Sequence, residues 1–361
     1  MSMSKKILVC MSGGVDSSVV AALLKEEGYD ITGAYMKQWS DSEELSGVCS
    51  WKEDRRDALR VAASLGISLL TLDFEKEYKE WVMKYMFDEY EKGKTPNPDV
   101  MCNKYIKFGF WLKKAEELGF DAIATGHYCS VEERNDKFHL MMAKDQNKDQ
   151  CYFLHQLNQE QLSKAMFPLG KYDKSEVREL AEKFELPTAK RAESMGICFI
   201  GEVPMQEFLS QKIKPKKGMI VFSDGTELGE HDGLPFYTIG QRNVGVESSA
   251  VSQKKGENRP LFVVAKNEES NELVLGFDDD PLLFAKKRYL DDMHFILGND
   301  PEFPFSCKVR LRHRQELQEA SIDKDDTGYF VEFKEAQRAV TPGQFCVVYK
   351  DGECFGGGSI L

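Results

Sequence analysis

The stretch that decides the fold of this chain is residues 5–18, which read KKILVCMSGGVDSS. Ile7 to Met11 form an unbroken apolar run of strand length, a pattern typical of a parallel strand covered on both faces. Residues 12–14 are Ser-Gly-Gly, and glycine accepts backbone angles closed to other residues and lets a ligand approach the main chain. Apolar residues then recur at helical spacing up to Gly28, a residue type that often ends helices. The stretch therefore predicts a strand, a tight turn and a helix.

The turn is suited to binding a phosphate, because unpaired N–H groups and the positive end of the helix dipole meet there. A dinucleotide fingerprint is excluded, since Gly13 and Gly14 are adjacent. A Walker loop is excluded too, because the Gly-Lys-Thr at 93–95 has Asp88 in the place of the first glycine and follows no apolar strand. Residues 12–17 instead resemble the S-G-G-x-D-S loop of ATP pyrophosphatases, which cleave ATP to AMP and pyrophosphate and adenylate an oxygen. An ordinary glycine-rich turn is the alternative, and the complete motif in this context disfavours it.

Length, charge and cysteine content narrow the class of protein. The chain has 361 residues, enough for two or three domains with sizeable cores, and no apolar run approaches the length of a membrane span. The first strand begins almost at the N-terminus, so we expect no signal or transit peptide. Nine cysteines without a C-x-x-C pair argue against a disulfide scaffold or a zinc site, and we expect a cytoplasmic protein. With a formal charge of −12, any nucleic acid must be held by local basic patches.

The first half of the chain alternates between strand and helix patterns. Further strands are expected at 29–36, 67–74 and 120–125, and helices at 54–65, at 75–90 and from 99 to about 119. This alternation predicts an α/β fold with a doubly wound parallel sheet, whose ligands bind at the carboxyl ends of the strands. Residues 12–17 and Gly126-His127 both follow such ends.

The segment 95–103 carries the first candidate thiol. Its two prolines favour an extended turn, and Asp99 is the expected N-cap of the following helix. Cys102 would then lie in the first turn, at position N3, where the dipole and the nearby Lys104 and Lys107 favour a thiolate. A capped helix with a small buried thiol is an equally good interpretation.

A second candidate thiol, Cys198, lies in residues 194–201, which read SMGICFIG. Two glycines flank a short apolar run there, so the segment is either a loop with a reactive cysteine or a buried strand. Taken alone, the pattern favours the strand.

The combination of motifs is more specific than any one of them. In order, the chain contains SGGVDS at 12–17, NPDVMCN at 97–103, GH at 126–127, KDQCYFL at 148–154, GICF at 196–199 and GLPFYTIGQR at 233–242. This set resembles the tRNA-specific 2-thiouridylase family, which replaces the 2-oxygen of the anticodon wobble uridine by sulfur. The resemblance runs from Lys5 to near the C-terminus, and Cys10 stands where a glycine is common.

The resemblance implies a catalytic set and its reactants. Cys198 would carry a persulfide, loaded by a sulfur relay protein or a cysteine desulfurase, and Cys102 would be the partner nucleophile that attacks either the persulfide or the base. Asp99 would serve as general acid or base, and Cys102 and Cys198 would end as a disulfide that must be reduced. ATP and Mg²⁺ are the implied cofactors, and the anticodon loop of tRNA is the implied partner.

The resemblance also implies two sets of binding residues. The nucleotide would contact Cys10, Met11, Ser12, Gly13, Gly14, Val15, Asp16, Ser17, Met36 and Gly126. The tRNA would contact Asn97, Pro98, Asp99, His127, Lys148, Asp149, Gln150, Arg312, His313 and Gln344. For His127, the alternative is a structural histidine at a strand end.

The second half of the chain has short strand and turn patterns. We expect a catalytic domain over 1–205, a small central domain over 206–280 and a C-terminal β-barrel-like domain over 281–361. Within 306–314, a period of two would place Lys308, Arg310, Arg312 and Arg314 on one strand face. That face is either a phosphate-tracking stripe or an ordinary solvated surface.

Two other functions fit parts of the sequence. The loop alone also fits an ATP pyrophosphatase that adenylates a carboxylate, a purine carbonyl or a cytidine, although the pair Cys102 and Cys198 favours sulfur transfer. An ATP-binding thiol sensor without turnover is a candidate of another class. Cysteine spacing does not indicate an iron–sulfur cluster, although dispersed ligands stay open.

Overall fold

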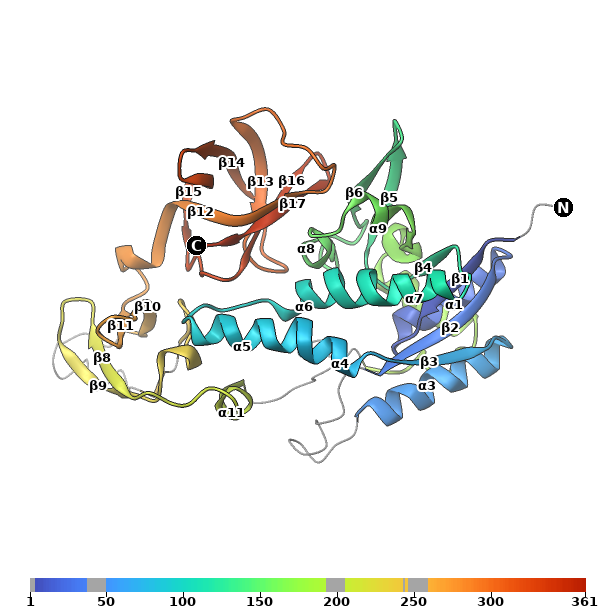
Figure 1. The fold of residues 1–361 in the computed structure, drawn as a ribbon, viewed down its shortest axis with the longest axis horizontal. Coiled ribbons are helices and arrows are strands. Elements are labelled where there is room, and N and C mark those ends of the chain that lie inside the picture. Colours follow the sequence, from blue (N-terminus) through green and yellow to red (C-terminus); the bar gives the residue numbers. More distant parts are fainter. Residues whose placement is uncertain (1–3, 38–49, 193–204, 243, 246–258) are drawn as a thin grey trace.

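The structure, a computed structural model, describes residues 4–37, 50–192, 205–242, 244–245 and 259–361 (Figure 1). Its first sheet has five strands in the order β3-β2-β1-β4-β7, and each neighbouring pair is parallel. The strands are β1 (Lys6–Cys10), β2 (Asp30–Lys37), β3 (Leu69–Asp73), β4 (Ala122–Ala124) and β7 (Ala165–Met166). The strand order reverses direction between β1 and β4, which makes their carboxyl ends the switch point where ligands bind in such sheets.

Both faces of this sheet are buried, as the apolar run of β1 predicts. Ile7 and Val9 pack in one core with α1 (Val15–Glu26), α3 (Ser50–Leu65) and α10 (Lys174–Lys183). Leu8 and Cys10 pack in another core with the helices that follow β3. The doubly wound parallel sheet is therefore confirmed.

Two long helical segments cover the second face and run side by side (Figure 1). The first joins α4 (Glu75–Tyr78), the π-helix η1 (Lys79–Met83) and α5 (Lys84–Glu91), and the second joins α6 (Pro98–Met101), the π-helix η2 (Cys102–Trp111) and α7 (Leu112–Glu117). The predicted cap at Asp99 is wrong: Asn97 is the N-cap, and its side chain accepts a hydrogen bond from the Val100 N–H at 3.4 Å. Proline fits the first helical position because it has no N–H to satisfy, so Pro98 moves the helix start two residues back. Cys102 consequently lies beyond the first turn.

A hairpin that our sequence analysis did not identify follows β4. Its strands are β5 (Cys129–Arg134) and β6 (Lys137–Met142), and β6 pairs with β17 of the C-terminal sheet. The next elements are α8 (Cys151–Leu154), α9 (Gln159–Ser163), the 3₁₀ turn η3 (Pro168–Lys171) and, later, α11 (Met205–Ser210). The hairpin thus joins the N-terminal and C-terminal parts of the molecule.

A small sheet forms the middle of the chain. Its order is β10-β11-β8-β9, with β8 (Gly218–Phe222), β9 (Glu227–His231), β10 (Phe262–Asn267) and β11 (Glu272–Gly276). The 3₁₀ turn η4 (Leu234–Phe236) packs on it, and Ile220, Val263 and Leu273 lie in its core.

The C-terminal strands close into an antiparallel barrel, as expected. After the 3₁₀ turn η5 (Pro281–Leu283), the strands are β12 (Phe284–Phe295), β13 (Phe305–Arg310), β14 (Gln318–Asp325), β15 (Gly328–Arg338), β16 (Phe345–Lys350) and β17 (Glu353–Ile360). Their order is β12-β15-β14-β13-β16-β17, and pairing of β12 with β17 closes the ring. The predicted domain boundaries stay predictions.

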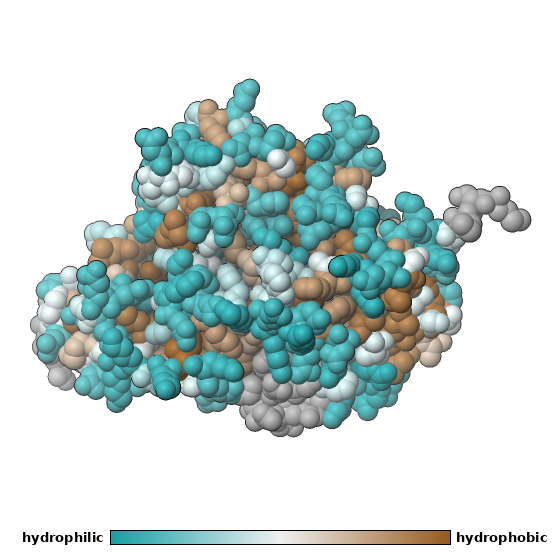
Figure 2. Space-filling model, in the orientation of Figure 1, coloured by the Kyte–Doolittle hydropathy of each residue, from teal (hydrophilic) through white to brown (hydrophobic). Residues whose placement is uncertain are grey.

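Polar residues cover most of the face in Figure 2, with apolar residues scattered between them. Among the described residues, no helix combines the length and apolar character needed to cross a membrane.

The predicted basic stripe on β13 is wrong at Arg310. This side chain is 6% exposed, and its Nη1 lies 3.1 Å from Oδ1 of Asp149, whose side chain is fully buried. The Asp149 carboxylate also accepts a hydrogen bond from the Ala143 N–H at 2.9 Å. Because β13 ends at Arg310, the alternation does not continue to Arg312, which is exposed. Arg310 is therefore an internal partner of Asp149 rather than part of a surface stripe.

We expect Asp149→Asn to lower the free energy of unfolding by about 3 kcal/mol or more, because it leaves a buried guanidinium without its counter-charge. Urea denaturation of the purified variant measures this. The matched control is Glu319→Gln, which removes the 3.5 Å pair with Lys308, where both side chains are about half exposed, and should cost less than about 1 kcal/mol. Equal effects of the two substitutions would contradict this assignment.

Candidate active site

The pyrophosphate-type loop lies between β1 and α1, at the switch point of the sheet. Gly13 has a φ of +82°, and Gly14 is the N-cap of α1. Ser17 Oγ accepts a hydrogen bond from the Ser12 N–H at 3.1 Å and donates one to the Gly14 carbonyl at 3.2 Å. These bonds hold residues 12–17 in one curved loop at the positive end of the α1 dipole.

The loop is closely packed at two glycines, Gly13 within it and Gly126 beside it. A Cβ on Gly13 would lie 2.3 Å from the Asp54 carbonyl oxygen at the start of α3. A Cβ on Gly126, after β4, would lie 3.1 Å from the Ser17 nitrogen. Residues 12–17 and Gly126 both follow carboxyl ends of the sheet, as expected, and the structure shows in addition that they lie in contact.

Asp16 of the loop has two partners that sequence reasoning missed. Its Oδ1 accepts hydrogen bonds from the Tyr128 hydroxyl at 2.9 Å and from Lys174 Nζ at 2.6 Å. Lys174 is the first residue of α10, 158 positions from Asp16, so no local pattern could have revealed it. The Lys174 ammonium therefore forms an ion pair with the Asp16 carboxylate of the loop.

His127, next to Gly126, is buried and neutral. One ring nitrogen, Nδ1, lies 2.7 Å from Thr125 Oγ1, and Nε2 lies 3.4 Å from Lys107 Nζ. An ammonium group can only donate, so Nε2 accepts and Nδ1 carries the proton. Burial, and secondly the Lys107 charge, hold the pKa of His127 well below its usual value. In this conformation the ring matches the alternative of a structural histidine.

Cys102 is 1% exposed and shares a core with Cys10 and Met36, which are 8% and 4% exposed. The thiol thus fits the interpretation of a small buried cysteine in this conformation, although Asp99 nearby is half-buried. Cys198 lies in 193–204, outside the described residues, so its convergence with Cys102 stays a prediction.

Several residues that are predicted to bind tRNA lie near the contact between the barrel and residues 95–98. Gln344 Nε2 donates hydrogen bonds to the carbonyls of Thr95, at 2.9 Å, and Pro96, at 3.3 Å, directly before Asn97 and Pro98. The Tyr152 hydroxyl lies 3.4 Å from Gln344 Oε1 and 3.2 Å from the Leu311 carbonyl. The C-terminal barrel therefore contacts the segment that precedes Cys102.

His313, Lys148 and Gln150 lie close to the same contacts. The His313 ring lies 4.6 Å from the Phe153 ring, and burial, with the charges of Arg314, Arg310 and Lys148, lowers its pKa to about 4. Gln150 Oε1 accepts a hydrogen bond from the Tyr128 N–H at 3.0 Å. Asp149 differs from its neighbours, since its carboxylate is buried against Arg310 and does not reach the surface.

The sequence of this chain matches known protein families over nearly its whole length. Three family models match the chain: a tRNA methyl transferase HUP domain at 5–202, a tRNA methyl transferase PRC-barrel domain at 206–277 and an aminomethyltransferase beta-barrel domain at 285–360. The tRNA-specific 2-thiouridylase MnmA of Shouchella clausii is 46% identical over 98% of this chain and 96% of its own length. Its namesake in Streptococcus thermophilus is 48% identical over 98% of this chain and 95% of its own. The chain belongs to the tRNA-specific 2-thiouridylase family.

Two solved structures show a more distant likeness to this chain. The U34-tRNA thiolase NcsA of Methanococcus maripaludis, with its [4Fe-4S] cluster, is 20% identical, with a TM-score of 0.36 over 58% of this chain and 65% of that one. A 4-thiouridine synthetase in complex with RNA and ATP is also 20% identical, with a TM-score of 0.38 over 57% and 50%.

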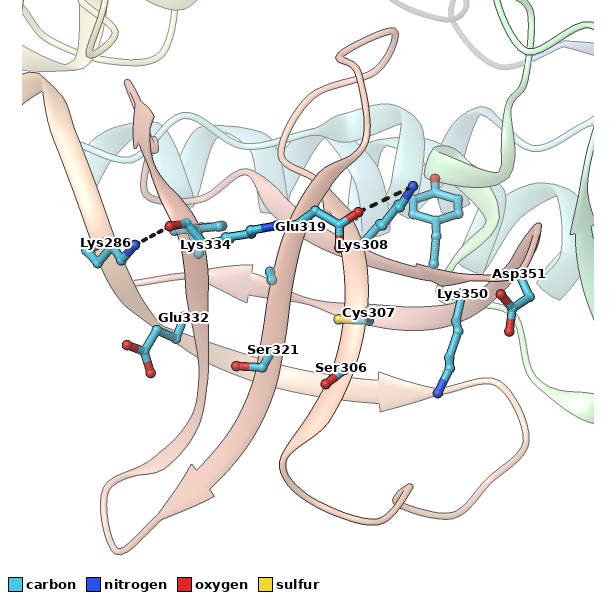
Figure 3. A pocket seen from close by; sticks show the side chains of 13 residues that line it. Lys286, Ser306, Cys307, Lys308, Glu319, Ser321, Glu332, Lys334, Lys350 and Asp351 are labelled. Atoms are coloured by element: carbon cyan, nitrogen blue, oxygen red, sulfur yellow. Dashed lines mark hydrogen bonds and ion pairs between the residues drawn. The ribbon is translucent and has the colours of Figure 1, made fainter.

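A cavity among the described residues lies away from the pyrophosphate-type loop. It has a volume of about 490 Å³ and lies on the barrel, lined by residues of β12–β16 (Figure 3). Four lysines alternate with three acidic residues there, and Lys308 pairs with Glu319 at 3.5 Å. Burial raises the pKa of Cys307, the cavity's thiol, to about 12. The cavity contains none of the predicted site residues, so we assign the active site to the loop region instead.

Gly13→Ala should reduce ATP affinity at least about tenfold, because the new methyl group would displace the loop or α3 from their contact at Asp54. Isothermal titration of ATP measures this. Gly28→Ala is the matched control: Gly28 has a φ of +86° and nothing within 4 Å of an added Cβ, so the change should cost about 1–2 kcal/mol of stability but no ATP affinity. Wild-type affinity in Gly13→Ala would show that the close packing is dispensable.

Proposed function

We propose that this chain, as a tRNA-uridine 2-sulfurtransferase, transfers AMP from ATP to the 2-oxygen of uridine 34 and then replaces that oxygen by sulfur. The observation that carries the proposal is the S-G-G-V-D-S loop at the switch point of the sheet, with Gly126 packed against it. Family membership supports the choice of tRNA as substrate.

The first step makes a poor leaving group into a good one. A uracil 2-carbonyl resembles a urea, so its oxygen leaves only after activation. The 2-oxygen attacks the α-phosphorus of ATP, the bond to the β-phosphate oxygen breaks, and pyrophosphate leaves. The N–H groups of residues 12–17, the α1 dipole and the Lys174 ammonium would stabilise the charge that develops on it.

Asp16 suits a magnesium ion at this position. Proteins commonly hold Mg²⁺ through one or two carboxylates together with phosphate oxygens and water. Asp16 is the carboxylate of the loop, and its side chain is 34% exposed. When bound, the ion would neutralise phosphate charge.

The second step uses two thiols. The outer sulfur of a Cys198 persulfide attacks C2 of the base and AMP departs; the Cys102 thiolate then attacks the Cys198 Sγ, which leaves sulfur on the base and a disulfide in the protein. Alternatively, Cys102 attacks that Sγ first and releases sulfide, which then attacks C2. Both routes give thiouridine, AMP and a Cys102–Cys198 disulfide, and an external thiol must reduce this disulfide. Because Cys102 is 1% exposed here, RNA binding has to open its surroundings.

We further propose that the flipped base lies beside Asn97, Pro98 and Asp99, with Asp99 as general acid or base and His127 behind the site. Met36 and Gly126 would border the adenosine. The tRNA would extend over Lys148, Gln150, Arg312, His313 and Gln344, and Asp149 would take part only through its main chain. The contacts of Gln344 with Thr95 and Pro96 support a continuous surface. A persulfide-donating relay protein or cysteine desulfurase would load Cys198 in the cytoplasm.

Incubation with ATP, Mg²⁺, a persulfide source and bulk tRNA should yield 2-thiouridine, detected by mass analysis of the nucleosides. We expect Cys102→Ser and Cys198→Ser each to abolish the product while ATP affinity stays within about twofold of wild type, since neither thiol is needed by the loop. Cys307→Ser, a buried thiol of the barrel, is the control and should retain activity. Undiminished thiolation by Cys102→Ser or Cys198→Ser would contradict the two-thiol mechanism. Pyrophosphate release that does not require tRNA would contradict the proposed adenylation of uridine 34.

Arg312→Ala should weaken tRNA binding and lower the slope of log affinity against log salt by about 0.7–0.9, the contribution of one phosphate contact. Arg312 is exposed, and its Nη2 donates a hydrogen bond to the Arg338 carbonyl at 3.0 Å. Filter binding over a salt series measures the slope. The control is Lys308→Ala, which removes an exposed cation paired with Glu319 and should leave the slope unchanged. If Arg312→Ala also has the wild-type slope, Arg312 does not contact a phosphate of the tRNA.

A further inference from the structure

Arg191 reaches from a distant segment to the main chain of the pyrophosphate-type loop. Its Nη1 donates hydrogen bonds to the Gly13 carbonyl at 2.7 Å and to Asp57 Oδ2 at 2.9 Å. Its Nη2 donates to Asp54 Oδ1. One guanidinium thus joins the loop to two carboxylates of α3.

Both ends of Arg191 are held in place. Arg178 of α10 donates hydrogen bonds to the carbonyls of Ala189, at 2.9 Å, and Arg191, at 2.7 Å. The Arg191 N–H donates to the Thr188 carbonyl at 2.9 Å. These contacts fix the position of the guanidinium that donates to the Gly13 carbonyl.

The bond to Gly13 fixes the direction of a backbone N–H. In a trans peptide, the carbonyl and the N–H of the next residue point in opposite directions. With the Gly13 carbonyl turned to Arg191, the Gly14 N–H faces the other way, where it donates a hydrogen bond to Oγ of the exposed Ser12 at 3.3 Å. That is the side on which an anion can approach the loop.

Side chains restrict this peptide little, so hydrogen bonds set its direction. It joins two glycines, which have no Cβ to restrict them, and Gly13 already has a φ of +82°. Rotation would turn the Gly13 carbonyl oxygen, a partial negative charge, toward the anion and remove one N–H donor. A loop that must bind phosphate therefore needs an external restraint on this peptide.

We propose that Arg191 is a positioning residue, which locks the Gly13–Gly14 peptide with the Gly14 N–H toward the pyrophosphate portion of ATP. Arg191 is not itself a phosphate ligand in this arrangement, because Asp54 and Asp57 neutralise its charge. The inference rests on the proposed use of ATP by the loop.

The test compares ligands with and without the pyrophosphate portion. Arg191→Met keeps the apolar part of the side chain but loses every hydrogen-bond donor. Arg191→Gln is too short to reach the Gly13 carbonyl. The control is Lys190→Ala, because Lys190 is an exposed neighbour. Isothermal titration measures the Kd values of ATP, inorganic pyrophosphate and AMP. For ATP and pyrophosphate we expect the Kd to rise about 10- to 100-fold, the effect of losing one charge-assisted hydrogen bond. For AMP we expect a change of less than about twofold. Arg191→Lys, which keeps one donor, should recover most of the ATP affinity.

Two results would overturn the inference: unchanged ATP and pyrophosphate affinity in Arg191→Met, or equal weakening for AMP and ATP, which marks a general structural role. Arg191→Gln gives the same comparison if thermal melting shows that Arg191→Met does not fold. Failure of the wild-type chain to bind ATP would instead contradict the proposed function itself, and the inference with it.

Discussion

The close contact between the ends of β1 and β4 is the constraint on which the rest of this structure depends. Gly13 lies against the Asp54 carbonyl, and Gly126 lies against Ser17, so the loop, α3 and the segment after β4 meet without intervening side chains. Parallel strands place such ends together, and the strand order reverses between β1 and β4, the position at which sheets of this kind bind ligands. Two cations from distant segments also contact the loop: Lys174 pairs with Asp16, and Arg191 donates a hydrogen bond to the Gly13 carbonyl.

A second set of contacts joins the loop-bearing sheet to the parts that follow it. Thr95 and Pro96 are held by Gln344, and the Thr95 hydroxyl lies 3.2 Å from that of Thr238 in the middle of the chain. The barrel and the central sheet therefore both contact the segment that leads into Cys102. Substrate bound across these surfaces would act directly on the surroundings of that thiol.

Burial keeps most of the described thiols unreactive. All seven of these cysteines are buried, and burial raises the pKa of Cys10, Cys129, Cys151, Cys307, Cys346 and Cys354. The thiolate is the reactive form, so these residues would not compete for a persulfide. Such protection is chemically useful in a protein that handles activated sulfur.

Sequence alone determined the strand–loop–helix unit at 5–18, the parallel sheet and the barrel, because apolar periodicity and glycine spacing are local properties that residues a few positions apart express together. The family was indicated by the resemblance of the ordered set of motifs rather than by periodicity. Tertiary structure decided the partners. Arg310 looks like a surface cation in its strand, yet it pairs with Asp149, 161 positions away. Lys174 and Arg191 lie in segments with no motif of their own, and the cap at Asn97 depends on Pro98 rather than on the acidic residue that follows. Ion pairs and hydrogen bonds depend on which distant segments the fold brings within about 3 Å, and no local pattern encodes that distance.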